Sequence, residues 1–452
     1  MIFRIHKNIY TKPGTIMFLY VMVMPLLFMY SIFSPTLRNR FLFIVFILIA
    51  NCLALLGFWI GARIIKLKNY NTINQFDVLK LVNCLFWIAL IVSIPKYVLY
   101  SGDYSFNIVN RLFNLINGDV TFLDSYNARQ NLVSVSGIWK IINYLIIIAS
   151  PFHWIYLPLS VFFWKTLKFY KKIGTFFIFF LFVFQYVSSG ASVGFIYFTI
   201  ILASSWLMKD AIQSDELRFT NRIKKIDKRK KIHFLILIML AFASILAFGA
   251  IMHDRGSGQE KTFILIGNEI LFPNEKSIIW KIIPNAYKST SINVYSYVLK
   301  AYAALDMALS IAGIVKTPLC FGAGGSWFLA DNVKQLFGYD VIDQTYNMRI
   351  HEMFGYNYYT QWHTVYVWLA NDFTFFGVPI VLFLLMIIWG LAWKDYLQSH
   401  NLFAFLLMVV FVEFVVFIPM NNQVFQHPET LFAFWGLLLT WLYTRKKYCF
   451  KL

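Results

Sequence analysis

Apolar stretches of roughly 16 to 25 residues recur along this chain, and each is long enough to cross a hydrocarbon core of ~30 Å as a helix. One segment of about 110 residues, between Met252 and Phe373, breaks this pattern. It contains Gly, Pro, Tyr, Trp, Asn and charges of both signs. Because binding and chemistry need polar groups around a shaped cavity, we expect the functional residues to be concentrated there.

The composition belongs to a membrane protein, because 59% of the residues are hydrophobic and only 13% are charged, against ~25% in soluble domains. The sequence predicts an all-α polytopic membrane protein with about ten transmembrane helices and one large external loop. The segment 17–34 lacks a small-residue cleavage site, so we interpret it as an anchor and not as a signal peptide. The expected spans are 16–34, 41–62, 81–100, 141–164, 173–189, 191–208, 232–252, 370–393, 401–420 and 429–444.

Charge predicts the topology. With a cytoplasmic N-terminus, the cytoplasmic segments carry 25 Lys and Arg and 6 Asp and Glu, whereas the remaining chain carries 15 of each. The whole net charge of +19 then lies on one face, as the positive-inside rule requires. We expect both termini in the cytoplasm. We also expect a seven-helix region (1–252), an external loop (253–369) and a three-helix region (370–452).

The basic loop 209–231 supplies most of this charge, and we interpret it as a topogenic loop near anionic lipid and not as a nucleic-acid site.

Inside the external loop, weak amphipathic patterns at Thr262–Phe272 and Ser296–Val315 predict helices lying on the membrane surface. The spacing Gly57–Gly61 predicts close helix packing within the monomer. The glycine-rich segment 321–326 lacks the Lys-Ser/Thr of a phosphate-binding loop, so it predicts a turn.

External arginines are candidates for binding an anionic substrate. Arg255 follows the seventh span directly, between His253-Asp254 and a Gly-Ser-Gly turn, and Arg129 and Arg349 are the other two. A guanidinium group binds phosphate oxygens in a bidentate manner, which suits a pyrophosphate at the membrane surface. The alternative is that each arginine extends to lipid phosphate without further function.

Candidate acids and bases lie near these arginines. The external histidines His253, His351 and His363 titrate near ~6.5 when unperturbed, and each has a structural hydrogen bond as its alternative. Nearby carboxylates are Asp254, Glu352 and Asp372. No zinc-ligand spacing or nucleophile elbow is present in the sequence.

Aromatic residues precede the eighth span. Tyr359, Trp362 and His363 are interleaved with amides and hydroxyls, as in a carbohydrate site, although an interfacial aromatic belt also explains them. If the eighth helix continues outward without a break, then Gln361, Trp368 and Asp372 share one face and His363 points away from it.

These motifs resemble those of the bacterial polysaccharide repeat-unit polymerases, the O-antigen or capsule polymerases of the Wzy type. Asn357-Tyr358-Tyr359-Thr360 is similar to the family's N-x-x-T, and Asp372-Phe373 with Gly377 is similar to D-F-G-x-x-G, where Thr374 replaces the first glycine. The segment 297–302 is similar to a Tyr-rich part of the family's large loop, and Arg129 and Arg255 fall where members place external arginines. The segment 188–192 lacks the arginine of the family's G-x-R.

The resemblance implies a GT-C-like, inverting glycosyltransferase without metal or cofactor. It implies action on undecaprenyl-pyrophosphate-linked oligosaccharides at the outer, periplasmic side of the bacterial cytoplasmic (inner) membrane, beside membrane lipid and with a chain-length regulator protein as partner. Arg129, Arg255 and Arg349 would bind pyrophosphate, and Tyr359, Trp362 and His363 would contact substrate. The base stays open among His253, Asp254, His351 and Asp372. The alternatives are an O-antigen ligase and a lipid-linked oligosaccharide flippase.

Overall fold

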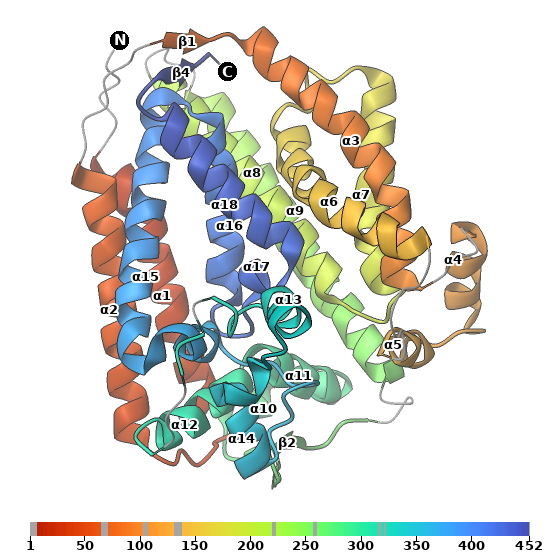
Figure 1. Ribbon diagram of the computed structural model, residues 1–452, viewed down its shortest axis with the longest axis vertical. Helices are drawn as coiled ribbons and strands as arrows, with labels where there is room; N and C mark the ends of the chain where they lie inside the picture. The colour runs from red at the N-terminus through yellow and green to blue at the C-terminus, as the bar shows by residue number, and fades with distance from the viewer. Residues whose placement is uncertain are drawn as a thin grey trace. The chain divides into compact units, whose positions relative to one another are not determined.

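The computed structural model describes residues 7–64, 71–102, 107–130, 138–218, 223–255, 260–314, 318–320 and 322–451 (Figure 1). Almost all of its regular structure is helical. The elements in chain order are α1 (Lys7–Tyr30), α2 (Arg40–Ile64), β1 (Asn71–Ile73), α3 (Gln75–Ser101), α4 (Ile108–Asn117), α5 (Phe122–Gln130), α6 (Ile138–Phe162), α7 (Phe169–Val187), α8 (Val193–Arg218), α9 (Ile223–Arg255), β2 (Ile264–Ile266), β3 (Glu269–Leu271), α10 (Ile278–Ile282), α11 (Asn285–Val298), α12 (Ala301–Ile311), α13 (Trp327–Phe337), the 3-10 helix η1 (Ile342–Gln344), α14 (Tyr346–Phe354), α15 (Val365–Ser399), α16 (Leu402–Phe417), α17 (Gln423–Gln426), α18 (Pro428–Thr444) and β4 (Tyr448–Phe450).

Eight helices in the described part of the chain are long and apolar enough to cross a membrane. They coincide with eight of the ten expected spans. The expected span 401–420 corresponds to α16, a shorter apolar helix, and the span 429–444 corresponds to α18, which has 17 residues. The chain is therefore a multi-pass, helical membrane protein.

The chain divides into two compact units. Unit 1 contains Met1–Leu67, Lys261–Gln398 and Val410–Leu431, and unit 2 contains Lys68–Glu260, Ser399–Val409 and Phe432–Leu452.

In unit 1 the helices α1, α2 and α15 pack closely. Helix α2 lies along α1. A Cβ atom at Gly57 would collide with the carbonyl oxygen of Phe383, and one at Gly61 would collide with that of Ile387, both on α15. The prediction that this glycine pair packs inside the monomer is confirmed, because only glycine permits such close contact of two helix backbones.

The long segment between the seventh and eighth spans folds into short elements, from β2 to α14. The prediction of a helix over Thr262–Phe272 is wrong, because β2 and β3 form an antiparallel hairpin in which Ile264 pairs with Leu271. Gly267 and Asn268 occupy the turn, and Gly267 has φ +59°. A two-residue turn that needs positive φ selects glycine, and it favours a hairpin over a helix.

Helix α12 is enclosed within unit 1. The prediction that the helix within Ser296–Val315 lies on the membrane surface is wrong for α12, because every residue of α12 except Ser310 is buried. Asp306 explains the position of α12, because its carboxylate accepts hydrogen bonds from the main-chain N–H groups of Arg38 (2.8 Å) and Asn39 (3.4 Å). These donors precede α2, so a carboxylate from the long segment stabilises the start of a membrane helix.

In unit 2, α3 lies along α6 and α7, and α8 contacts α6, α7 and α9. Helix α5 packs against the end of α9. The strands β1 and β4 pair in parallel, with Asn71 opposite Tyr448. Unit 2 thus gathers the membrane helices from the middle of the chain.

Candidate functional site

The centre of unit 1 is a carboxylate held by a glycine-rich turn. Asp372 on α15 accepts hydrogen bonds at Oδ1 from the main-chain N–H groups of Gly322 (2.8 Å) and Gly324 (2.9 Å). A Cβ atom at Gly325 would lie only 2.7 Å from Asp372 Oδ2. Residues 322–326 form the predicted turn, and N–H groups of this turn bind a carboxylate of the chain itself. This use of two N–H groups from one turn resembles the anion-binding concavities of other turns.

Amide side chains extend this centre into a buried polar network. Asn371 accepts a hydrogen bond from the main-chain N–H of Tyr346 (2.9 Å) and donates to Asn347 Oδ1 (2.7 Å). Asn422 donates to the carbonyl oxygen of Gly325 (3.0 Å). Asn371 and Asp372 are 1% and 3% exposed, so Asp372 holds the turn from an enclosed position. Its assignment as a catalytic base stays a prediction.

Helix α15 does not continue outward to Gln361, so the condition under which Gln361 would share a helical face with Asp372 is not met. The helix begins at Val365, and Thr374 interrupts it with φ 62° and ψ 166°. Before the helix, Asn357 Oδ1 accepts hydrogen bonds from the N–H groups of Tyr359 (2.8 Å) and Thr360 (3.1 Å). An asparagine that bonds its own following backbone favours a turn over a helix.

His363 lies among the buried aromatic side chains of unit 1, so its ring points into the protein. Its ring centroid is 5.2 Å from that of Tyr356 and 5.8 Å from that of Trp368. Burial lowers the pKa of His363 to about 3, although the Gln361 main chain acts in the opposite direction, and the charges of Lys300 and His351 add to the lowering. The imidazole is therefore neutral near pH 7 and supplies no positive charge to a substrate.

Three of the predicted residues lie on or beside α14. The ring centroids of His351 and Tyr359 are 6.2 Å apart, and the ring centroid of Trp327 is 6.5 Å from that of Tyr359. Tyr359 is 62% exposed. The ring centroid of Tyr358 is 4.7 Å from that of Trp327 and 5.1 Å from that of Tyr359. We call His351, Tyr358, Tyr359 and Trp327 the aromatic surface.

Arg349 is on the same helix as His351, but two residues correspond to about 200° around the axis, so the structure places the two side chains on different sides. Arg349 Nη1 lies 3.2 Å from Glu352 Oε2. Two buried atoms, Arg349 Nε and His351 Nδ1, make no hydrogen bond within the described residues. Such atoms are uncommon in native proteins.

Trp362 belongs to a second cluster, with Tyr297, Tyr356 and Lys300. Lys300 was not among the candidate residues predicted from the sequence. The Trp362 ring lies 5.0 Å from that of Tyr297, and the Tyr356 hydroxyl donates to the Trp362 carbonyl oxygen (2.9 Å). The Lys300 ammonium group stands 5.9 Å from the Tyr356 ring. Burial, with a contribution from Lys261, lowers the pKa of Lys300 to about 8. Its aromatic partner is 56 positions away, so no local pattern could have indicated it.

The other described candidates lie in unit 2, where Asp254 and Arg255 hold α5 on α9. Asp254 accepts a hydrogen bond from the N–H of Phe122 at the start of α5. The Arg255 guanidinium carbon lies 3.7 Å from the Tyr126 ring centroid, and Nη1 is 3.5 Å from the carbonyl oxygen of Gly190. His253 beside them is exposed.

Two of the sequence-based candidates fall outside the described residues. Arg129 is on α5, but its side chain is not among them, and neither is the predicted Gly-Ser-Gly turn after Arg255. The structure thus brings His351 and Tyr359 together in unit 1, whereas His253, Asp254 and Arg255 lie in unit 2.

Within the described parts of the chain, no group of three or more His, Cys, Asp or Glu side chains is arranged to hold a metal ion. Comparisons with family models, with curated proteins and with solved structures gave no match.

Proposed function

We propose that this protein is a membrane glycosyltransferase that polymerises polyprenyl-pyrophosphate-linked oligosaccharide repeat units into a surface polysaccharide. The observation that carries the proposal is the aromatic surface, in which Tyr359 is exposed between His351 and Trp327. Sugars stack their C–H faces on such rings while polar side chains bind their hydroxyls. Membrane helices beside this surface suit a substrate that is anchored by a lipid.

The proposed reaction is a single displacement. A hydroxyl oxygen of one unit attacks the anomeric carbon of the growing chain, and the bond from that carbon to the pyrophosphate oxygen breaks. The pyrophosphate leaves with the electron pair, and the hydroxyl proton passes to a base. Cationic side chains stabilise the charge that develops on the leaving group.

His351 is a candidate base, because its ring belongs to the aromatic surface beside the exposed ring of Tyr359. The candidate cations stay Arg129, Arg255 and Arg349. Stacking on Tyr126 holds the planar guanidinium group of Arg255 in a fixed orientation, which suits binding of a leaving pyrophosphate.

The direct test uses the purified full-length chain in phospholipid vesicles with a polyprenyl-pyrophosphate-linked oligosaccharide. We expect products that are longer by whole repeat units, together with one equivalent of released polyprenyl pyrophosphate per bond. Deleting the gene should leave surface glycolipid with a single repeat unit. Complete loss of these units would instead favour the ligase or the flippase.

A matched pair of variants tests the aromatic surface. Tyr359→Ala removes an exposed ring that contacts His351 and Trp327, and we expect it to raise KM for the oligosaccharide by about ten-fold, on the scale of ~1.4 kcal/mol for one stacking contact. Tyr339→Ala is the control, because Tyr339 is 49% exposed and belongs to neither cluster. Equal KM values for the two variants would refute this location of the sugar site.

A further inference from the structure

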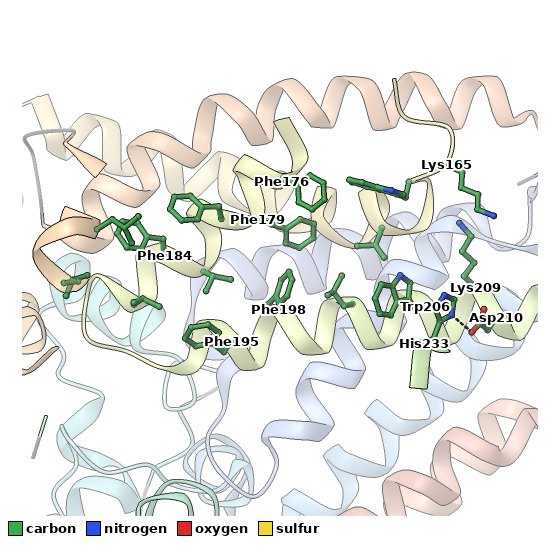
Figure 2. Close-up of a pocket in the computed structure, with 18 of the residues that line it drawn as sticks. Lys165, Phe176, Phe179, Phe184, Phe195, Phe198, Trp206, Lys209, Asp210 and His233 are labelled. Atoms are coloured by element: carbon green, nitrogen blue, oxygen red, sulfur yellow. Dashed lines mark hydrogen bonds and ion pairs between the residues drawn. The ribbon is translucent and has the colours of Figure 1, made fainter. Parts of the chain in front are cut away.

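Unit 2 contains a large groove that the proposed reaction does not use. Its volume is about 1090 Å³, and it is lined by α6, α7, α8 and α9, with α4 and α5 at one end. Phenylalanine rings follow most of its length, as Figure 2 shows; they include Phe176, Phe179, Phe180, Phe184, Phe195 and Phe198. The volume slightly exceeds the ~300–1000 Å³ of ordinary small-molecule sites, and the lining suits a long hydrocarbon chain.

One end of the groove is polar. Lys165, Lys209, Asp210 and His233 gather there, and Figure 2 shows the two ammonium groups directed toward each other. Asp210 Oδ2 lies 2.9 Å from His233 Nδ1, so this carboxylate already has a partner.

The two lysines are only partly neutralised. Lys209 donates to the carbonyl oxygen of Phe162, and the positive charge of Lys165 lies close enough to repel it. Lys165 is exposed and forms no hydrogen bond or ion pair within the described chain. Two neighbouring cations beside a single carboxylate leave a net positive charge, which is a site for an anion.

The polar end lies at the boundary of the membrane helices. The candidate span of α6 ends at Phe162 and that of α7 begins at Phe169, so Lys165 lies between them. The span of α8 ends at Ile212, just after Lys209 and Asp210, and the span of α9 begins at Lys231, next to His233. Lipid phosphates lie at this level of a bilayer, and the row of phenylalanines extends from it along the spans.

We propose that the groove holds a diacyl phospholipid of the leaflet that borders the basic loops, with its phosphate at Lys165 and Lys209 and its hydrocarbon along the phenylalanine rings. The opposite end of the groove favours this orientation, because its lining residues Leu112, Leu115 and Phe122 are apolar. The inference does not depend on the proposed polymerase activity.

Two described cations beside α4 and α5 are engaged with the protein. Arg111 donates to Ser125 Oγ (2.7 Å) and to the carbonyl oxygen of Ser188 (3.1 Å), and Arg255 stacks on Tyr126. Among the described lining residues, a lipid that entered with its phosphate at this end would therefore meet no cation.

The test places a photoreactive benzoylphenylalanine at Phe198, inside the groove, in the full-length chain. The control position is Phe234 on α9, which is 63% exposed and does not line the groove. The protein is inserted in vesicles of equimolar phosphatidylglycerol and neutral galactosyl diacylglycerol with a small fraction of polyprenyl phosphate. The cross-linked lipids are then identified by mass spectrometry.

We expect phosphatidylglycerol to exceed the glycolipid at Phe198 by about ten-fold, the factor that one charge-assisted contact supplies, and to match it at Phe234. Lys165→Gln should remove most of this preference. Lys168→Gln is the matched control and should keep it, because Lys168 is exposed in the same loop but does not line the groove.

Val183→Trp, which fills the groove, should lower the total cross-linking at Phe198. Equal capture of the two diacyl lipids at Phe198, or a preference that Lys165→Gln leaves unchanged, would overturn the proposal. Preferential capture of polyprenyl phosphate would also overturn it, in favour of a site for an isoprenoid chain.

Discussion

The carboxylate of Asp372 accepts a hydrogen bond of 2.9 Å from the main-chain N–H of Gly324, which joins two residues 48 positions apart in the sequence. A second N–H, from Gly322, donates to the same oxygen. This contact attaches the glycine-rich turn to α15, and through Asn371 it also attaches α14. The buried network is therefore the framework on which the aromatic surface depends.

Asp372→Asn should weaken this framework, because the amide replaces one acceptor oxygen with a donor that faces other donors. Loss of a charge-assisted hydrogen bond in a buried site costs ~2 kcal/mol, so we expect a lower unfolding midpoint in detergent. The control Asp331→Asn, on the exposed side of α13, should shift the midpoint little. An unchanged midpoint for Asp372→Asn together with lost polymer would instead indicate direct catalysis by Asp372.

Gly324→Ala tests the close approach of the turn to α15. The added methyl group would lie 2.8 Å from Asn371 Cβ and 3.0 Å from Cys320 Cβ, so the turn must move. We expect a loss of ~1–3 kcal/mol of stability, measured as a fall in the unfolding midpoint. Gly313→Ala is the control, because nothing lies within 4 Å of its added Cβ. Equal midpoints for the two variants would show that the turn is not tightly held.

Thr374→Gly should stabilise the protein. Thr374 has φ 62° and ψ 166°, a backbone region that glycine alone occupies readily. Such a conformation costs a non-glycine residue ~1–3 kcal/mol, so glycine should raise the unfolding midpoint. Thr374→Ala keeps the Cβ atom and should give no gain. A lower midpoint for the glycine variant would mean that the threonine side chain contributes more than the strain removes.

The sequence predicted the membrane helices well, because a run of about 20 apolar residues has few other structures open to it. Eight of the expected spans coincide with long apolar helices. It predicted the long segment poorly, because the structure there depends on distant contacts. Asp306 stabilises the start of α2 from 268 positions away, and nothing around Asp306 indicates that partner.

The candidate site shows the same limit. The motif that contains Asp372 and the glycine-rich turn were both visible in the sequence, but their contact was not. The Asn357 turn could have been predicted, since asparagine often bonds the backbone that follows it. Burial of His363 could not, because its neighbours become neighbours only after α15 breaks from the expected helix.

His363 should make stability depend on pH. Its pKa is about 3 in the folded protein and near the ordinary 6.5 in the unfolded chain, so between these values the unfolded chain binds a proton that the folded protein excludes. Stability contributed by the neutral ring is complete above pH 6.5 and falls by at most ~1.4 kcal/mol per pH unit below it. The measurement is the unfolding midpoint between pH 7 and pH 5.

The slope of midpoint against pH should be smaller in His363→Phe, which keeps an aromatic ring without a titrating group. His253→Gln, at an exposed histidine, should leave the slope unchanged. If His363→Phe retains the wild-type slope, the ring does not exclude its proton in the folded state.

Arg255→Ala should abolish long polymer if Arg255 binds the leaving pyrophosphate. Removing one charged partner from a water-poor site costs ~3 kcal/mol or more, which corresponds to a rate at least 100-fold lower. Arg255→Lys should restore only part of the rate, because lysine keeps the charge but loses the planar group that stacks on Tyr126. The measurement is the length distribution of surface polysaccharide together with the unfolding midpoint.

The midpoint separates catalysis from packing, because Arg255 also holds α5 through Tyr126. Arg63→Ala is the matched control, since Arg63 also lies at a span end with its guanidinium carbon 5.9 Å from the Trp59 ring centroid. We expect it to leave polymer length unchanged. If Arg255→Ala lowers the midpoint but still yields long chains, the side chain only holds α5 in place, and the pyrophosphate contact must come from Arg129 or Arg349.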